Sequence, residues 1–541
     1  MQRILTLCLC MCVAWGLSAQ DTRFIDEIFE VGEPELGVTY GTNISILTGD
    51  ALPLELKMDI YQPEGDGADD VERPVVCIFH TGNFLPQFVN RGAYGSRLDS
   101  ANVEIIRRLV RRGYVAASVS YRQGWLPTAL DQETRLGTLL QAAYRGGQDA
   151  HTLARYLRFT VDQQDNPYNI DTSRIVFMGT GTGGYVVHTH AFLDRNEEIG
   201  ENIQFYTSTG DTLIQGDTLG DPQGVRPALI NIPNWVGYSS DVAMAINVGG
   251  ACGDPNWIEG QDHEPLYMGF HSYTDDLAPF YEGQVGVPIG GGNFLPVITG
   301  ARGSNGVLEI IDDQGGQPEL DDALANPLPS MFPALSSELN TLNEDYKMQE
   351  VVSPVANDVM DTFQLSRDHL WPFVYNRTII APYNWFDEAT FRAGVDAFNA
   401  ATMGNLDADV VIAAEEQSNP NWDDPVEAQK TIDTMIAYML PRLWYGLDLD
   451  AIVSTEDLVD AATVGLEVYP NPASDFVRIE LAEGYKIREI ALIDMMGRLT
   501  GNWTGIDQSS FRIDRGTLVR GYYNVRLRTD EGIVTQRVLF E

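Results

Sequence analysis

The segment 171–185 reads DTSRIVFMGTGTGGY. Its continuous apolar run RIVFMG (174–179) is typical of a strand that is covered on both faces of a sheet. The glycine-rich stretch that follows, GTGTGG (179–184), leads into a helical pattern. The segment therefore predicts a strand, a tight turn and a helix in that order.

Strand and helix patterns alternate on both sides of this segment. Other strands are expected at 54–61, 75–80, 114–121, 243–250 and 265–270. Helices are expected at 103–113, at 142–161 and after the cap residue Asp424. This alternation predicts an α/β fold with a doubly wound, mostly parallel sheet. The stretch from about 283 to 345 is rich in Gly, Pro and Asp with little periodicity, which is typical of a long insertion or lid.

Acidic residues dominate the charge of the 541-residue chain. Its 35 Lys and Arg against 77 Asp and Glu give a formal net charge of −42. Because binding to phosphate backbones needs clustered cations, this balance excludes nucleic acid as a partner. We interpret the acidic surface as a device for solubility in a salty or extracellular setting. Calcium binding is the alternative, although the sequence contains no Asp-rich loop of regular spacing.

The N-terminal residues MQRILTLCLCMCVAWGLSAQ (1–20) have the layout of a secretory signal peptide, with one basic residue, a short apolar stretch and a small residue, Ala19, at its end. We expect residues 1–19 to be removed; a buried N-terminal helix is the alternative. Since no other apolar run of about 18 residues follows, the sequence predicts no transmembrane segment in the mature chain. Cys77 and Cys252 remain after cleavage, either as small core residues or as one disulfide.

Composition changes near residue 464. Residues 464–541 carry ten basic and eleven acidic residues, so almost all of the negative charge lies before them. The preceding stretch LDLDAIVSTEDLVDAA (447–462) is acidic, lacks a strong period and is interpreted as a linker. The sequence therefore predicts a large domain at 20–446, a linker at 447–463 and a small domain at 464–541.

Three loops follow expected strands at the sheet edge where α/β folds carry their chemistry. HTGNF (80–84) follows the strand at 75–80, GTGTGG (179–184) follows the central strand, and HSYTDD (271–276) follows the strand at 265–270. These loops, together with YRQGW (121–125), YRGGQDAHTLARYLR (144–158) and DHLWPF (368–373), stand in an order and spacing that resemble the α/β-hydrolase family, in its carboxylesterase and lipase-like branch.

The resemblance covers roughly residues 38–445. It implies an ester-hydrolase fold in which HTGNF is the oxyanion loop, Asp275 is the catalytic acid and His369 is the catalytic base. Alternative interpretations remain for both side chains: Asp275 as a turn or cap residue, and His369 as an ordinary surface histidine.

The nucleophile of that family is missing. Its turn reads Gly-x-Ser-x-Gly, and alignment on Gly179 and Gly183 puts Gly181 in the place of the serine. Thr182 at the apex would have Thr180 crowding the turn, and a β-branched residue there would cost about 1–3 kcal/mol of backbone strain. Gly181 takes this turn without strain, so the sequence predicts a cleft without the standard nucleophile.

The other site residues keep a chemical meaning. His80 and Gly82 lie in the oxyanion-type loop, and backbone N–H groups near Gly82 and at Thr182 would form an anion-accepting pocket whatever the side chains. Asp275 would orient His369, and such a pair activates water as a general base.

No metal site and no cofactor are expected. His188 and His190 lie two residues apart on the helix after the turn, so their side chains do not share a face.

Residues 464–541 alternate apolar and polar residues over strand lengths that are broken by Gly, Asp and Asn. The pattern predicts a small antiparallel β-sandwich. Its YPNPASD (469–475), DMMGR (494–498), GYYNVRL (521–527) and TQRVLFE (535–541) closely resemble the type A C-terminal sorting domain of the type IX secretion system. The resemblance implies the type IX export machinery as a partner and a secreted or cell-surface location. An unrelated Ig-like module is the alternative.

Two functions follow from these observations. The first is a secreted or cell-surface relative of carboxylesterases with a lapsed or non-standard catalytic site and a cleft for a small-molecule, lipid or carbohydrate ligand. The alternative is an active extracellular ester hydrolase that uses His369 and Asp275 with an atypical nucleophile or an activated water.

Overall fold

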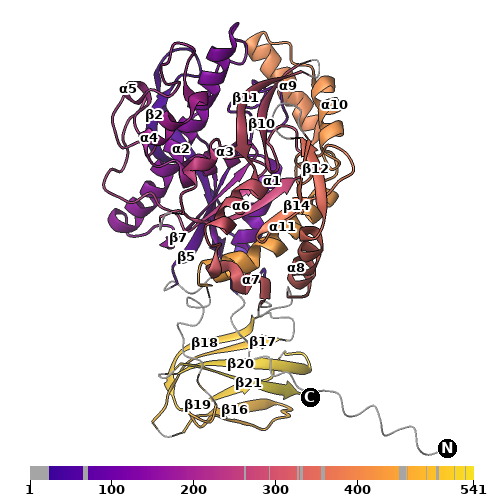
Figure 1. Ribbon diagram of the computed structural model, residues 1–541. Helices are drawn as coiled ribbons and strands as arrows, with labels where there is room; N and C mark the ends of the chain where they lie inside the picture. The colour runs from indigo at the N-terminus through magenta and orange to yellow at the C-terminus, as the bar shows by residue number, and fades with distance from the viewer. Residues whose placement is uncertain are drawn as a thin grey trace, which may run out of the picture. The chain divides into compact units, whose positions relative to one another are not determined.

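A computed structural model describes the chain in two compact units, Arg23–Leu449 and a C-terminal unit within Asp450–Glu541 (Figure 1). The described residues are 23–64, 71–260, 263–290, 293–325, 328, 333–354, 360–449, 459, 461–482, 484–494, 499–516, 518–529 and 532–541. The predicted signal peptide, residues 450–458 of the predicted linker and the MMGR part of DMMGR lie outside these ranges.

The larger unit is built on one eight-stranded sheet with the order β2-β3-β6-β5-β7-β8-β9-β14. Strand β3 is antiparallel to both of its neighbours, and the other pairs are parallel. The strands are β2 (Glu35–Ser45), β3 (Leu52–Tyr61), β5 (Arg73–Phe79), β6 (Val115–Val119), β7 (Ile170–Thr180), β8 (Met244–Val248), β9 (Leu266–Ser272) and β14 (Leu370–Phe373). The predicted α/β class with a mostly parallel sheet is confirmed.

Helices cover the sheet in two layers, because strands β5 to β8 are buried on both faces and need cover on both sides (Figure 1). The long helices are α1 (Ser100–Val110), α2 (Gln132–Gln163), α3 (Thr182–Phe192), α6 (Ser304–Asp313), α8 (Pro333–Lys347), α9 (Glu388–Thr402), α10 (Ala408–Ser418) and α11 (Pro425–Gly446). Helix α1 packs against α11, and α2 packs against α3.

Two features of these helices follow directly from the sequence: the close approach of α2 to α3 and the start of α11. A Cβ at Gly146 or Gly147 of α2 would approach Val186 or Thr189 of α3 to 2.6 Å, so the two glycines allow the helices to lie close together. In α11, Asp424 accepts the backbone N–H groups of residues 426 and 427, as expected of an N-cap before proline.

The predicted insertion at 283–345 has more regular structure than its composition suggests. Strands β10 (Glu282–Gly290) and β11 (Asn293–Arg302) form a hairpin, and helix α6 packs against β9 as part of the helical layer. Helix α7 (Asp321–Ala325) and α8 follow. The hairpin escapes detection because glycines at positions 283, 286 and 290 and a proline at position 288 interrupt the apolar alternation that marks a strand.

Short elements complete this unit. They are β1 (Glu30–Val31), β4 (Pro63–Glu64), β12 (Glu350–Pro354), β13 (Met360–Gln364), α4 (Asn196–Glu201), α5 (Gly216–Leu219) and 3₁₀ turns at Ile203–Phe205, Pro255–Trp257 and Pro318–Leu320. Cys77 in β5 and Cys252 are both buried free thiols, so the disulfide alternative is not formed.

The C-terminal unit is an antiparallel sandwich, as predicted. Its sheets have the orders β15-β16-β19 and β18-β17-β20-β21. The strands are β15 (Glu467–Tyr469), β16 (Phe476–Glu480), β17 (Ile487–Asp494), β18 (Leu499–Gln508), β19 (Ser510–Asp514), β20 (Gly521–Thr529) and β21 (Ile533–Phe540). Alternate residues such as Val477 and Ile479, or Val525 and Leu527, are fully buried in its core.

Within the described ranges, no helix has the length and apolar character needed to cross a bilayer.

Candidate functional site

The turn between β7 and α3 has the geometry of a nucleophile elbow. Its apex is Gly181, with φ 52° and ψ −116°. The flanking glycines are required by space: a Cβ at Gly179 would lie 2.1 Å from the carbonyl oxygen of Gly183, and a Cβ at Gly183 would lie 2.0 Å from that of Phe79. The chain therefore keeps the small residues of the elbow and lacks only its nucleophile.

The space for a nucleophile side chain is occupied by a neighbour. A Cβ on Gly181 would lie 2.2 Å from Oγ1 of Thr81 and 2.9 Å from its Cβ. Thr81 belongs to the HTGNF loop, directly after β5. The positive φ of Gly181 and the threonine beside it thus fit together, and the apex is closed to any larger residue unless Thr81 moves.

The HTGNF loop is held in an unusual backbone conformation. Gly82 has φ 127°, and the non-glycine residues Asn83 and Phe84 both have φ 54°. The loop is fixed by hydrogen bonds from Trp125 Nε1 to the carbonyl of Asn83 (2.7 Å) and from the Tyr121 hydroxyl to the carbonyl of His80 (2.8 Å). Strained backbone of this kind persists only where the surroundings hold it, and it is concentrated at binding sites.

His80 itself does not line the site. Its ring is 2% exposed, stacks on Tyr121 at 5.0 Å between ring centroids, and bonds through Nδ1 to the carbonyl of Thr81. Burial lowers the pKa of His80 to about 4, so the ring is neutral at neutral pH. Its role in this geometry is to support the loop.

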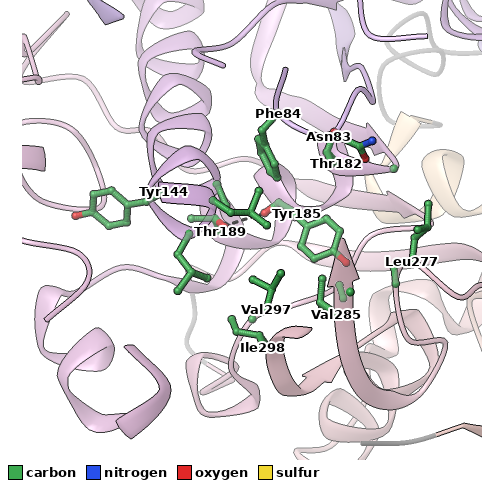
Figure 2. Close-up of a pocket in the computed structure, with 18 of the residues that line it drawn as sticks. Asn83, Phe84, Tyr144, Thr182, Tyr185, Thr189, Leu277, Val285, Val297 and Ile298 are labelled. Atoms are coloured by element: carbon green, nitrogen blue, oxygen red, sulfur yellow. Dashed lines mark hydrogen bonds between the residues drawn. The ribbon is translucent and has the colours of Figure 1, made fainter. Parts of the chain in front are cut away.

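A cavity of about 150 Å³ opens beside the elbow at the carboxyl edge of the sheet. Figure 2 shows how its walls converge: Phe84 comes from the HTGNF loop, Tyr185 from α3, Val285 from β10 and Ile298 from β11. The β10–β11 hairpin thus covers the cavity, as expected of a lid. The lining is mainly apolar, and it includes Thr81, Gly181, Thr182 and Asp275.

Asp275 follows β9 and brings the only carboxylate among the described residues that line the cavity. It is 6% exposed. Its Oδ1 accepts the backbone N–H groups of Leu277 (2.8 Å) and Ala278 (3.0 Å), so Asp275 is also a turn residue. Its Oδ2 has no hydrogen-bond partner among the described residues.

The structure brings His271, and not His369, towards this carboxylate. His271 Nε2 lies 3.6 Å from Asp275 Oδ2, and both side chains are fully buried. His271 is on β9 itself, behind the cavity wall, and it is not one of the lining residues. Sequence reasoning missed this pair, although four residues separate the two positions in the HSYTDD segment.

His369 lies at the other end of its strand. It immediately precedes β14, whose first residue, Leu370, pairs with Gly269 in the middle of β9. The carboxyl end of β14, where the cavity lies, is four residues further on, or about 13 Å of strand. The expected pairing of His369 with Asp275 is therefore not formed. The segment DHLWPF misled the alignment because its histidine comes before the strand and not after it.

His369 has different surroundings from those expected of a base. Its ring is 3% exposed, and Nδ1 has no hydrogen-bond partner among the described residues. Burial, followed by the charges of Arg442 and Lys347, holds the pKa of His369 well below its usual value. It is neither an ordinary surface histidine nor part of the cavity.

A buried ion pair supports the loops around the cavity, and sequence reasoning did not single it out. Arg122 Nε donates to Asp149 Oδ1 at 2.8 Å, and both side chains are fully buried. The Arg122 backbone N–H donates to the same carboxylate, and Arg145 lies beside it. These residues belong to the motifs YRQGW (121–125) and YRGGQDAHTLARYLR (144–158), whose structural role is therefore to hold a buried ion pair.

No group of three or more metal-ligating side chains occurs in the part of the chain that the structure describes. His188 is bonded to the carbonyl of Gly184 and, at 2.9 Å, to the Tyr267 hydroxyl, and His190 to the carbonyl of Ser240. Both rings are therefore engaged in the packing of α3.

The buried His188 gives a prediction for stability against pH. Burial lowers its pKa to about 3, whereas the unfolded chain takes up the proton near pH 6.5. Because the unfolded state binds more protons below pH 6.5, stability is lost as the pH falls. Between pH 7 and pH 5, wild type should lose about 2 kcal/mol more than His188→Gln. Urea unfolding at the two pH values tests this, and equal losses would contradict it.

Comparison with known families identifies the C-terminal unit. Residues 467–541 match the family described as secretion system C-terminal sorting domain. A comparison of the chain with characterised proteins gave no match.

The solved structures to which the chain is similar include esterases. Esterase 2 of Thermogutta terrifontis, phosphorylated by paraoxon, is 16% identical with a TM-score of 0.26, covering 46% of this chain and 73% of that one. A truncated carbohydrate esterase from gut microbiota is 16% identical with a TM-score of 0.25, covering 47% and 81%. Esterase B of Lactobacillus rhamnosis is 16% identical with a TM-score of 0.25, covering 46% and 67%.

At these scores the fold assignment rests on the strand order and the elbow described above, and not on the likeness. The family match gives the location, because sorting domains of this kind mark proteins for export. The chain thus joins an α/β-hydrolase-like unit to a secretion system C-terminal sorting domain, and it is a secreted or cell-surface protein.

Proposed function

We propose that the large unit binds an apolar small molecule outside the cell without hydrolysing it. One observation carries this proposal: the elbow apex is Gly181, and the Thr81 side chain fills the space that a nucleophile would need. Ester hydrolysis by this fold needs a side chain that attacks the carbonyl carbon and a base that takes its proton.

The position of the histidines supports the proposal. The chain has seven of them, and none is among the described residues that line the cavity. The loop after β14 brings Ile380 to the cavity wall. Hydroxyl-bearing residues do line the cavity, and Thr81 and Thr182 are the two at the elbow. Thr182 Oγ1 lies 3.3 Å from the Tyr121 hydroxyl, which is no base at neutral pH. Burial raises the pKa of Tyr121 further.

The shape and chemistry of the cavity favour an apolar ligand. Its walls carry Phe84, Trp125, Val285 and Ile298, the last two of which come from the β10–β11 hairpin. A concave apolar surface with a few polar groups is the usual form of a small-molecule site. Transfer of an alkyl chain from water to such walls contributes about 0.8 kcal/mol for each buried CH₂.

Three measurements on the purified full chain test the proposal. N-phenyl-1-naphthylamine, a neutral fluorescent probe of apolar sites, should bind and be displaced by octanol. A fluorophosphonate, which labels activated hydroxyls, should leave the intact mass unchanged, and p-nitrophenyl butyrate should be hydrolysed no faster than in buffer. Stoichiometric phosphonylation of Thr81 or Thr182 would overturn the proposal and restore an active hydrolase.

A cavity-filling variant supplies the control. Ala143 lines the cavity from α2, so Ala143→Phe should abolish binding of the probe. Gln163→Phe adds the same ring at the exposed end of the same helix and should leave binding intact. Equal binding by both variants would place the probe elsewhere.

A further inference from the structure

The cavity contains a carboxylate whose charge no neighbour neutralises. Asp275 lines the cavity and is 6% exposed, and its Oδ2 lacks a hydrogen-bond partner among the described residues. A Cβ added to Gly249, another lining residue, would come within 3.7 Å of that oxygen and of nothing nearer. The unpartnered atom therefore borders open space on the side of the cavity.

The nearest titratable neighbour, His271, makes no hydrogen bond to this carboxylate. His271 Nδ1 lies 3.3 Å from the backbone nitrogen of Ser304, which can only donate. The Ser304 hydroxyl oxygen lies at the same distance, 3.3 Å, from Nδ1, so this ring nitrogen faces Ser304 and not Asp275. The other ring nitrogen, Nε2, stands 3.6 Å from Asp275 Oδ2, beyond hydrogen-bond distance, and is itself unpartnered.

The other charged and titratable groups around Asp275 do not compensate it either. Lys, Arg and His are absent from the described lining residues. Burial, and after it the charge of Asp275, raises the pKa values of Tyr185 and Tyr383, so both tyrosines are neutral at pH 7. The adjacent Asp276 is itself an acid. A buried carboxylate without a partner is costly, and the cost is removed when a cation or a strong donor binds it.

We propose that the natural ligand is an amphipathic amine: an apolar chain or ring that fills the cavity, with an ammonium group that binds Asp275 Oδ2. This inference rests on the proposed function, because it names the head group of the ligand that the same cavity would hold. A neutral alcohol would satisfy the oxygen as a donor but would leave its charge in place.

An anionic head group is the alternative to the ammonium group, and it also has a structural basis. The N-terminus of α3 begins at Thr182 in the same cavity, and helix N-termini attract anions. However, the Thr81 side chain stands over the elbow at this end. A cationic and an anionic probe with the same chain therefore distinguish attraction by Asp275 from attraction by the helix N-terminus.

The test compares three probes with the same chain: octylamine, octanol and octanoate, each displacing N-phenyl-1-naphthylamine from the full-length protein at pH 7. We expect octylamine to bind about tenfold or more tightly than octanol, and octanoate to bind most weakly. In Asp275→Asn, octylamine should fall to the affinity of octanol. Asparagine keeps an oxygen for the N–H groups of Leu277 and Ala278, so the fold of the loop is preserved.

The exposed neighbour gives the matched control. Asp276→Asn removes the same charge one residue away without touching the cavity, and it should leave the order of the three probes unchanged. Equal binding of octylamine and octanol to wild type would overturn the head-group inference alone. Failure of octanol to bind would overturn the proposed function itself. Tightest binding of octanoate would overturn the inference in favour of the helix N-terminus.

Discussion

Replacement of Gly181 by serine should destabilise the large unit by about 2–6 kcal/mol and should produce no ester hydrolysis. A non-glycine residue at this backbone conformation costs about 1–3 kcal/mol. The new Cβ would also meet Oγ1 of Thr81 at 2.2 Å, and such overpacking costs about 1–3 kcal/mol more. Hydrolysis should stay absent because no histidine is brought to the cavity wall in the described structure.

A second substitution separates the two costs. In the background Thr81→Gly, the change Gly181→Ser should cost only the backbone strain, so that a double-mutant cycle gives a coupling of about 1–3 kcal/mol. Urea unfolding followed by tryptophan fluorescence measures this, since all but one of the nine tryptophans precede residue 464. Additive costs would show that Thr81 does not close the apex, and turnover of p-nitrophenyl butyrate by either serine variant would contradict the assignment of a lapsed site.

The substitution Asp149→Asn should destabilise the same unit by about 3–5 kcal/mol. Asp149 holds the fully buried Arg122 through Nε at 2.8 Å, and it is also close to the buried Arg145, two of whose nitrogens have no hydrogen-bond partner among the described residues. Burial raises the pKa of Asp149 and the arginines oppose that rise. Loss of the carboxylate would leave two guanidinium groups in the protein interior without a counter-charge.

An exposed ion pair provides the comparison for this variant. Asp217 is paired with Arg226 and is 96% exposed, so Asp217→Asn should change the free energy of unfolding by less than about 0.5 kcal/mol. A loss below about 1 kcal/mol for Asp149→Asn would mean that the buried pair contributes little beyond a surface pair. Arg145 donates to the carbonyl of Gly124, and the Gly124 N–H donates to the carbonyl of Phe84 in the HTGNF loop. Because these bonds join the buried ion pair to the cavity wall, Asp149→Asn should also weaken binding of N-phenyl-1-naphthylamine.

Export and binding fit together in this protein. The sorting domain places the chain outside the cell or at its surface. The proposed binding of an intact ligand would suit capture or presentation there. The acidic composition is consistent with attraction of the cationic head group proposed above, because a net charge of −42 raises the local concentration of cations.

Local sequence determined the elements of the fold and the state of the elbow. Continuous apolar runs predicted β5, β6 and β7 because parallel strands are buried on both faces. The spacing of Gly179, Gly181 and Gly183 predicted an apex without a nucleophile, since the elbow is a property of five consecutive residues. The sandwich at the C-terminus followed from alternation alone.

Tertiary structure alone decided which distant residues meet. The sequence could not show that Thr81 fills the space beside Gly181, that the glycine-rich stretch 282–302 folds into a hairpin over the cavity, or that His369 stands at the wrong end of β14. Likewise, it offered His369 as the partner of Asp275, whereas the histidine that approaches this carboxylate in the described structure is His271, with its Nε2 3.6 Å away. The physical reason is that the direction and register of neighbouring strands fix which loops share an edge, and both depend on pairings between residues far apart in the chain.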